Sequence, residues 1–331
     1  MSQDESRMRA VLARALGGPR DLLVETLPDP VPGPGEVLVR VSLAALNFFD
    51  TLIIAGRYQV RPDLPFSPAG ECAGVVEALG PGVEGWRVGE RVSAWLGYGC
   101  ARERVVVPAH RLIRVPDGVT DEQAAGLTVT YGTSLHGLRD RAGLRPGETL
   151  AVLGAAGGTG LAAVELGRLL GARVIACASS PEKLALAREH GADLLLDYQA
   201  EDLKEGLRRL TGGRGVDVIY DPVGGDLAEA SLRAIAWAGR YLVIGFAGGG
   251  IPKIPLNLLL LKGCDMRGVF WGAAVDRDPD AHRANMDDLL RWTAEGRLTA
   301  QVHGVFALDE IAEALEVLAR REARGKVLIR P

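Results

Sequence analysis

The sequence has little with which to build a structural metal site. Its 331 residues include only four cysteines, scattered singly as Cys72, Cys100, Cys177 and Cys264, and no C-x-x-C pair occurs. Structural zinc sites use closely spaced cysteine and histidine ligands, so this spacing argues against one. Cys177 falls in a predicted buried strand, where we expect it to be a small core residue.

Long apolar runs and a strong charge of either sign are also missing. The longest apolar runs are too short to span a bilayer, and the formal net charge is only −4. Composition therefore favours neither a membrane segment nor a nucleic-acid-binding surface. The start, Met-Ser-Gln-Asp-Glu-Ser-Arg, is polar and acidic, unlike a secretory signal or transit peptide, and is expected to be a frayed tail. We expect a cytoplasmic protein with small-molecule partners.

Two textures divide the chain, which is long enough for two domains. Residues 8 to about 125 show alternating apolar runs separated by Gly/Pro turns, which predicts a β-rich domain. From about 130 to 272, strands and helices alternate, which predicts a doubly wound parallel sheet. Strands are expected at 150–154, 173–178, 194–197, 217–220, 240–245 and 266–271. Helices are expected near 159–170, 181–190, 201–210, 226–236 and 255–261. Two amphipathic helices, near 281–294 and 309–321, and a strand at 326–329 follow and are expected to return to the β-rich domain.

The first strand of the alternating region ends in a glycine-rich turn. The apolar run 150–153 leads directly into Gly-Ala-Ala-Gly-Gly-Thr-Gly at 154–160. On the dinucleotide fingerprint, Ala155, Gly157 and Gly160 take the three glycine positions. Gly157 lets a pyrophosphate approach the backbone, and the next helix offers free N–H groups at its amino end. We expect this pyrophosphate site to consist of Ala155, Ala156, Gly157, Gly158, Thr159 and Gly160.

The second strand lacks the carboxylate that an NAD site usually has. Asp or Glu about 20 residues past the glycines holds the ribose 2′-OH of NAD, but here the strand ends in Ala-Ser179-Ser180, followed by Lys183. Two hydroxyls and an ammonium favour a 2′-phosphate. Tyr198 follows the next apolar run and is expected at the same edge. Ser180 as a helix cap and Lys183 as a solvated side chain are a compatible alternative. The sequence favours NADPH over NADH.

Motifs of a known family run along nearly the whole chain. They include Pro-Gly-Pro-Gly-Glu-Val-Leu-Val-Arg-Val at 32–41, Leu-Asn-Phe-Phe-Asp at 46–50, Gly-Glu-Cys-Ala-Gly-Val-Val-Glu at 70–77, Leu-Thr-Val-Thr-Tyr-Gly-Thr-Ser at 127–134 and Tyr-Asp-Pro-Val-Gly-Gly at 220–225. The chain resembles the zinc-free quinone oxidoreductase (zeta-crystallin-like) branch of the medium-chain dehydrogenase/reductases. The resemblance implies an α/β protein with a GroES-like catalytic domain (1–128 and 273–331), a Rossmann NADPH-binding domain (129–272) and a cleft between them.

The resemblance also bears on metal. In zinc members a cysteine stands where this chain has Asn47, and Gly-His-Glu stands where it reads Ala69-Gly70-Glu71. With two ligands replaced, we expect no bound metal. Alcohol oxidation is hard without a Lewis acid, so reduction of an acceptor already primed for hydride is the natural alternative.

Further site residues come from the same resemblance. It places Asn47 and Tyr58 near the nicotinamide and substrate as candidate catalytic groups, Thr130 at the nicotinamide ribose and Lys326 near the phosphates. A cap or turn role for Asn47 and mere lid packing for Tyr58 are the alternatives.

Three aromatic residues are expected to line the nicotinamide pocket. Phe246 follows the fifth strand, and Phe270 and Trp271 close the sixth. Ligands of such sheets lie beyond the carboxyl ends of the strands. Ordinary core packing is the alternative for the last two.

The function that we expect is NADPH-dependent hydride transfer to a quinone. Reduction of an activated C=C bond, as in acrylyl-CoA, enoyl-CoA or an alkenal, is an alternative. A non-catalytic, crystallin-like NADPH-binding protein is another. The resemblance also implies a homodimer, in which the strand at 266–271 pairs with its twin beside the apolar run 258–261.

Overall fold

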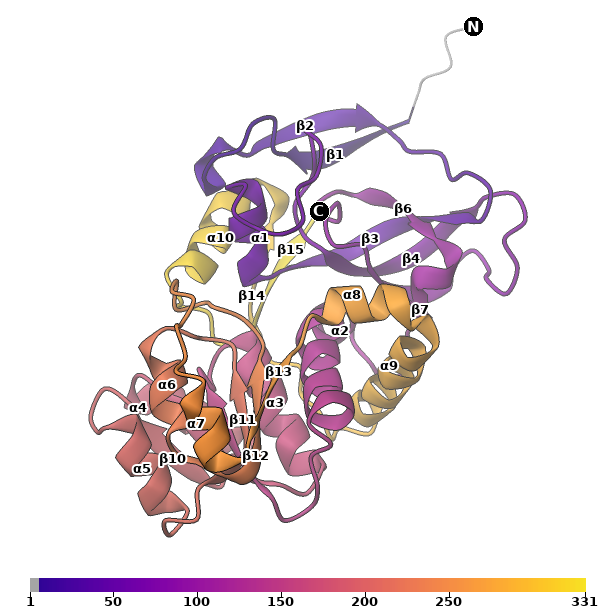
Figure 1. Cartoon of the computed structure of the whole chain (residues 1–331). Coiled ribbons are helices and arrows are strands. Elements are labelled where there is room, and N and C mark those ends of the chain that lie inside the picture. Colours follow the sequence, from indigo (N-terminus) through magenta and orange to yellow (C-terminus); the bar gives the residue numbers. More distant parts are fainter. Residues whose placement is uncertain (1–5) are drawn as a thin grey trace, which may run out of the picture. The chain divides into compact units, whose positions relative to one another are not determined.

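The computed structural model describes residues 6–331 (Figure 1). Residues 1–5, part of the expected frayed tail, lie outside the described residues. Contacts divide the chain into two units: one contains the residues up to Val129 together with Met286–Pro331, and the other contains Thr130–Asn285. We call them the mixed-sheet unit and the parallel-sheet unit. The second boundary between the units lies after residue 285. The sequence predicts this boundary after residue 272.

The parallel-sheet unit is built on six strands in the order β10-β9-β8-β11-β12-β13. All neighbouring pairs are parallel, and the residues of β8 are buried, as in a sheet covered on both faces. This order confirms the predicted doubly wound α/β sheet. The strands are β8 (Thr149–Leu153), β9 (Arg173–Ala178), β10 (Leu194–Asp197), β11 (Val216–Asp221), β12 (Ile235–Val243) and β13 (Asp265–Gly268).

Helices connect these strands and pack on them (Figure 1). Residues 136–141 continue α2 as a π-helix. Both boundaries between the units fall inside helices, namely α2 and α9. The helices between the strands are α3 (Gly158–Leu169), α4 (Pro181–Glu189), α5 (Leu203–Leu210), α6 (Asp226–Leu232) and α7 (Asn257–Lys262). Helix α2 (Asp121–Leu135) precedes the first strand of this sheet, and α8 (Trp271–Arg277) and α9 (Pro279–Ala294) follow the last. No helix within residues 6–331 has the length and apolarity that a membrane span requires.

Sequence-based boundaries in this unit are wrong for one helix and two strands. The helix expected to reach residue 236 ends at Leu232, and the strand expected at 240–245 is β12, which begins at Ile235 and ends at Val243. The strand expected to reach residue 271 ends at Gly268, and Trp271 opens α8. The indole of Trp271 packs against Gly132 of α2, where an added Cβ would lie 2.8 Å from the ring. Trp271 makes this contact from α8 and not from β13, so the apolar run at 266–271 leaves the sheet before its last residues.

The mixed-sheet unit contains a seven-stranded sheet with the path β14-β15-β3-β4-β5-β7 and with β6 paired to β3, beside a separate two-stranded sheet, β1-β2. The late strand β15 pairs antiparallel with the early strand β3. The strands are β1 (Arg7–Leu12), β2 (Leu23–Pro28), β3 (Glu36–Leu46), β4 (Glu71–Leu79), β5 (Arg91–Trp95), β6 (Arg104–Pro108), β7 (Leu112–Arg114), β14 (Val302–Ala307) and β15 (Lys326–Arg330). The helices wholly in this unit are α1 (Phe48–Ile54) and α10 (Ile311–Ala319).

The pairing of β3 brings three strand ends to one edge of this sheet. Both β4 and β15 run antiparallel to β3, with Ala45 opposite Glu71 and Leu46 opposite Val327. The carboxyl end of β3 therefore meets the amino ends of β4 and β15.

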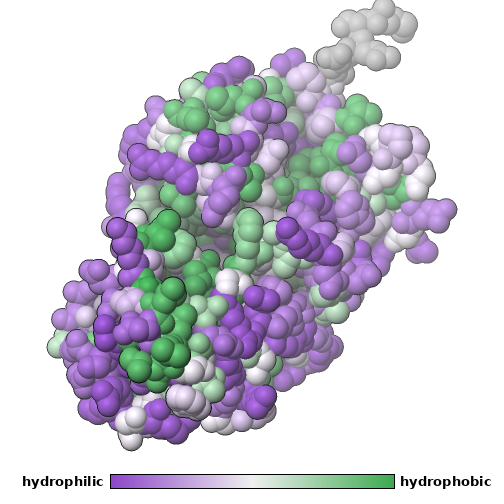
Figure 2. Space-filling view, in the orientation of Figure 1, coloured by the Kyte–Doolittle hydropathy of each residue, from purple (hydrophilic) through white to green (hydrophobic). Residues whose placement is uncertain are grey.

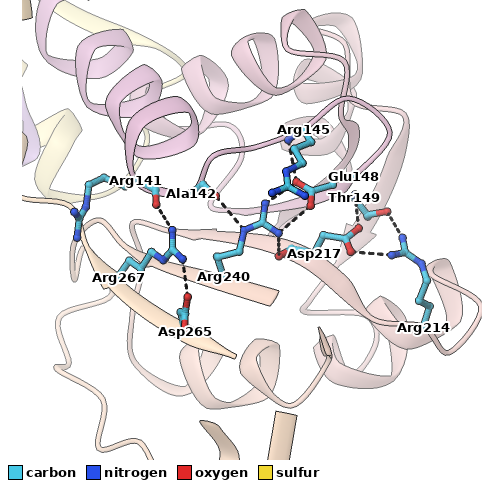
Figure 3. A network of polar contacts seen from close by, with 10 residues as sticks. All are labelled: Arg141, Ala142, Arg145, Glu148, Thr149, Arg214, Asp217, Arg240, Asp265 and Arg267. Atoms are coloured by element: carbon cyan, nitrogen blue, oxygen red, sulfur yellow. Dashed lines mark hydrogen bonds and ion pairs between the residues drawn. The ribbon is translucent and has the colours of Figure 1, made fainter. Parts of the chain in front are cut away.

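A network of charged side chains ties together the other end of the parallel sheet, where its strands begin (Figure 3). Arg240 donates to both carboxylate oxygens of Glu148, at 2.9 and 2.6 Å, and to the carbonyl of Ala142 at 3.0 Å. Burial would raise the pKa of Glu148, but bonds from Arg240 and from the Arg145 N–H outweigh it and lower that pKa. Since ligands of such sheets bind beyond the carboxyl ends of the strands, we read this network as structural.

Candidate active site

The glycine turn after β8 has the shape that a pyrophosphate site needs. Gly154 adopts a left-handed φ of 61°, which glycine tolerates best. A Cβ on Gly160 would lie 2.2 Å from the carbonyl oxygen of Gly154, so only glycine lets α3 sit this close to the strand. A Cβ on Gly157 would meet nothing nearer than 3.6 Å. The fold thus requires glycine at 160 but not at 157, where a Cβ would make only an ordinary contact.

The amino end of α3 follows this turn directly, and its first backbone N–H groups have no hydrogen-bond acceptor within the helix. The helix begins at Gly158, after the N-cap Gly157, and has no acidic residue in its first turn. The first N–H groups of a helix, here those of Gly158, Thr159 and Gly160, have no intrahelical acceptor and carry partial positive charge. Ala155 is buried, and its N–H donates to the carbonyl of Cys177 at 3.1 Å, which ties the turn to β9. The turn is therefore built to receive an anion.

Hydroxyls and an ammonium gather at the carboxyl end of β9. Ser180 caps α4 by accepting the Lys183 N–H at 3.4 Å, so the cap interpretation holds for its side chain. The ammonium of Lys183 donates to Ser179 Oγ at 3.3 Å. Tyr198 follows β10, and its N–H donates to the carbonyl of Ala178 at 3.1 Å. These four residues therefore lie at one edge of the sheet, as expected from sequence.

A carboxylate that sequence reasoning missed ties the loop after β11 to strand β12. Asp221 ends β11, and its Oδ1 accepts the N–H groups of Val223 and Gly224 at 2.8 and 2.9 Å. Its Oδ2 accepts the hydroxyl of Tyr241 at 2.5 Å. Burial raises the pKa of Asp221, and these hydrogen bonds oppose the rise. A carboxylate at the end of a predicted buried strand was the available signal.

The aromatic candidates of this unit differ in exposure. Phe246, 36% exposed, lies beside Gly224, where an added Cβ would be 2.7 Å from the ring. Phe270 is 55% exposed. Trp271 is buried, and its ring meets that of His282 edge-on with centroids 5.5 Å apart, while its place in the nicotinamide pocket stays a prediction. Thr130 is buried in α2.

In the mixed-sheet unit, Asn47 lies in a buried polar cluster at the edge where three strand ends meet. Lys326 Nζ donates to Asn47 Oδ1 and to Glu71 Oε1, each at 2.7 Å. Asn47 Nδ2 donates to Glu71 Oε1 at 2.9 Å, and Glu71 Oε2 accepts the Val129 N–H at 2.7 Å. The resemblance placed Lys326 near the phosphates; its side chain is instead 3% exposed and paired with Glu71. A role near the phosphates therefore stays a prediction for Lys326, and Glu71 is a second residue that sequence reasoning missed.

The segment that follows Asn47 carries a second buried carboxylate. Asp50 Oδ2 accepts the Asn47 N–H at 2.7 Å, and Oδ1 accepts the Ala69 N–H at 3.1 Å, so Asn47 also opens α1 as a cap residue. Burial raises the pKa of Asp50 to about 7, against the effect of these bonds and of Lys326.

Tyr58 is half-buried and stacks on Phe49, with ring centroids 5.6 Å apart and planes at 23°. Burial, and then the charge of Asp50, raise the pKa of Tyr58. Its phenol is therefore held as the neutral, donating form.

Position 70 has no room for a side chain. A Cβ on Gly70 would lie 2.6 Å from the ring of Trp95 and 2.8 Å from the carbonyl oxygen of Gly97. A histidine there would require both to move. Within residues 6–331, no three His, Cys, Asp or Glu side chains are grouped so that they could hold a metal ion.

The chain has relatives over almost its full length. Residues 33–117 match the alcohol dehydrogenase GroES-like domain, and residues 158–294 match the zinc-binding dehydrogenase family. The chain is 39% identical over 325 residues to the quinone oxidoreductase-like protein 2 homolog of Nematostella vectensis, which covers 97% of this chain and 88% of that protein. The chain belongs to the quinone oxidoreductase branch of the medium-chain dehydrogenase/reductases.

Solved structures of this branch share the fold. The quinone oxidoreductase of Pseudomonas syringae aligns with a TM-score of 0.91 at 33% identity, over 98% of this chain and 100% of that one. The Escherichia coli quinone oxidoreductase complexed with NADPH aligns with a TM-score of 0.92 at 28% identity, again over 98% and 100%. The GroES-like and Rossmann-type fold implied by the sequence motifs is thereby confirmed.

Proposed function

We propose that the protein is an NADPH-dependent oxidoreductase that reduces a quinone. The observation that carries the proposal is the cluster of Ser179, Ser180 and Lys183 beyond the glycine turn, at a strand end that has no carboxylate. The similarity to quinone oxidoreductases, one of them complexed with NADPH, supports both cofactor and acceptor. The reaction consumes one NADPH, one proton and one quinone, and yields NADP⁺ and hydroquinone.

The residues present fit this cofactor. The turn from Ala155 to Gly160, Ala156 included, offers backbone N–H groups and open space to a pyrophosphate. Ser179, Ser180, Lys183 and Tyr198 would hold the 2′-phosphate and adenosine ribose. We assign the nicotinamide half to Thr130, Phe246 and Phe270. When bound, NADPH supplies a hydride from C4 of its nicotinamide ring.

The catalytic groups that we propose are Asn47 and Tyr58. As hydride adds to a quinone, negative charge builds on its oxygen, and fixed hydrogen-bond donors stabilise that charge. An amide N–H and a neutral phenol are such donors. We propose that no metal takes part, because an amide at 47 and a glycine at 70, in a space closed to side chains, replace two ligand positions of zinc members.

Stopped-flow oxidation of NADPH against quinones, enals and acyl-CoA thioesters tests the proposal. We expect turnover with quinones, a lower rate with NADH, and no stoichiometric zinc by elemental analysis. A preference for acrylyl-CoA or an alkenal would favour the C=C reductase instead. Binding of NADPH with no turnover of any acceptor would favour the non-catalytic, crystallin-like role.

We also propose a homodimer formed through the parallel-sheet unit. Hydrophobic side chains gather over α7 in Figure 2, and Leu256, Leu260 and Leu261 of this region are 75%, 81% and 67% exposed. They precede β13 in the chain, and β13 ends the strand order and, among the described strands, pairs only with β12. An open strand edge with an apolar rim is a typical isologous interface. Light scattering should give a dimer for the wild type and a monomer for Leu260→Glu.

A further inference from the structure

We propose that Glu71 and Lys326 are positioning residues that fix the Asn47 amide so that its second Nδ2–H faces the acceptor oxygen. The inference rests on the proposed function, because it names how that reaction's hydrogen-bond donor is held. Lys326 and Glu71 form a buried ion pair, with Lys326 Nζ 2.7 Å from Glu71 Oε1 and side chains 3% and 0% exposed.

Each member of the cluster comes from a different strand end. Asn47 follows β3, Glu71 opens β4 and Lys326 opens β15, and the three strands are neighbours in one sheet. Backbone pairing therefore sets where the three side chains begin, and each has little freedom to move away. A donor needed in one fixed place is best built on such rigid elements.

The chemistry of the two partners determines which way the amide points. An ammonium can only donate and an ionised carboxylate can only accept. Asn47 Oδ1 must therefore face Lys326, at 2.7 Å, and Nδ2 must face Glu71, at 2.9 Å. The reversed amide would place like against like in both contacts. One amide hydrogen is then committed to Glu71, and the other has no partner among the described residues.

Asn47 is also the member of the cluster closest to solvent. Its exposure is 7%, against 3% for Lys326 and none for Glu71. A substrate oxygen would thus meet the amide before either charged group. Lys326 polarises the amide through Oδ1, which strengthens Nδ2–H as a donor in this buried cluster. The negative charge of Glu71 is balanced by Lys326 and by the Val129 N–H.

The variant Lys326→Met tests this role in enzyme that is otherwise unchanged. We expect kcat with a quinone to fall about 10- to 100-fold, toward the loss seen when an oxyanion donor is removed, while the Kd for NADPH stays within about twofold. Lys326→Arg, which keeps the charge, should recover part of kcat. Lys183→Met is the matched control. It should raise the Kd for NADPH and lower kcat less than Lys326→Met does. A large loss of NADPH affinity in Lys326→Met with unchanged kcat would overturn the inference and return this lysine to the phosphates.

Two further measurements guard against ambiguous outcomes. A lone buried Glu71 charge destabilises the fold, so Glu71→Gln/Lys326→Met removes both charges; it should melt near the wild type and still show the kcat loss. The side-chain amide protons of Asn47, identified by their loss in Asn47→Asp, report the geometry without turnover. In the wild type we expect two well-separated NMR signals that move together in the double variant.

These measurements test the proposed function and the role of the Glu71–Lys326 pair separately. If the wild-type protein turns over no acceptor, the proposed function is wrong. The NMR signals of the Asn47 amide would still test whether Glu71 and Lys326 position that amide. Signals and kcat that are both unaffected in the double variant would show that Glu71 and Lys326 only stabilise the sheet edge.

Discussion

Two glycines of the same turn should respond differently to replacement by alanine. Gly160→Ala should lower the stability of the protein, and Gly157→Ala should lower its affinity for NADPH. At Gly160 the new Cβ would lie 2.2 Å from the carbonyl oxygen of Gly154 and 2.8 Å from the Cα of Ala155, both backbone atoms that cannot rotate aside. At Gly157 the nearest atom would be 3.6 Å away, an ordinary contact. Gly160→Ala therefore overpacks the junction of β8 and α3, and Gly157→Ala does not.

The magnitudes follow from these distances. Overpacking costs about 1–3 kcal/mol, and a domain of this size loses about 2–4 °C of Tm per kcal/mol, so Gly160→Ala should melt about 2–12 °C lower. Gly157 is the N-cap of α3 with φ −74° and ψ 165°, a conformation open to alanine. Loss of a glycine cap there costs less than about 1 kcal/mol. Its methyl would fill the space proposed for the pyrophosphate, so NADPH should bind at least about tenfold more weakly, or 1.4 kcal/mol.

Differential scanning calorimetry and NADPH titration by fluorescence measure the two effects in the same preparations. The expected result is a crossover, with stability lost mainly in Gly160→Ala and affinity lost in folded Gly157→Ala. Unchanged affinity in Gly157→Ala would place the pyrophosphate elsewhere and refute this account of the turn.

Three other substitutions probe charges. Lys183→Glu should weaken NADPH by more than about tenfold, since charge-assisted bonds contribute about 1.5–3 kcal/mol, and should change NADH binding little; equal losses in titrations of both would make the lysine structural. Glu148→Gln should lower the free energy of unfolding by about 1.5–3 kcal/mol at pH 7. Because Arg240 lowers the folded pKa of Glu148, that difference from wild type should shrink as pH falls through the lowered pKa, and a pH-independent difference in urea unfolding would contradict the assignment. Asp50 has its pKa raised to about 7, above about 3.9 in the unfolded chain, so its stabilising contribution is complete below pH 4 and is lost as pH rises to 7. Asp50→Asn should remove this slope from the stability profile, and an identical profile would show that Asp50 is ionised throughout.

Local signals predicted the parallel sheet well. The path from β8 through the glycine turn to β9 is contiguous in sequence, and buried apolar runs and glycines mark it within one residue of the observed bounds. Hydrophobic periodicity could not predict that Trp271 leaves the sheet, because a short apolar run fits a strand and a buried helix equally. The contact with Gly132 that decides it is a tertiary contact.

The candidate site shows the same limit more sharply. The cluster of Ser179, Ser180 and Lys183 spans only five residues, so the sequence could predict that these side chains lie close together. Asn47 and Lys326 are 279 positions apart, and only the pairing of β3 with β15 brings them together. Resemblance supplied a role for Lys326 but not its partner, since no spacing rule connects a lysine to a carboxylate across a whole intervening unit.

The place of β15 in the sheet also governs how the protein is made. Glu71 leaves the ribosome 255 residues before Lys326, a delay of about 10–50 s at ordinary rates of translation. Until Lys326 follows, β3 lacks β15 and the Glu71 carboxylate lacks its counter-ion, whereas the parallel-sheet unit is contiguous and is synthesised completely within that interval. Nascent chains should therefore acquire a protease-resistant nucleotide-binding half before they gain the Asn47 cluster, which cannot form until Lys326 has been synthesised.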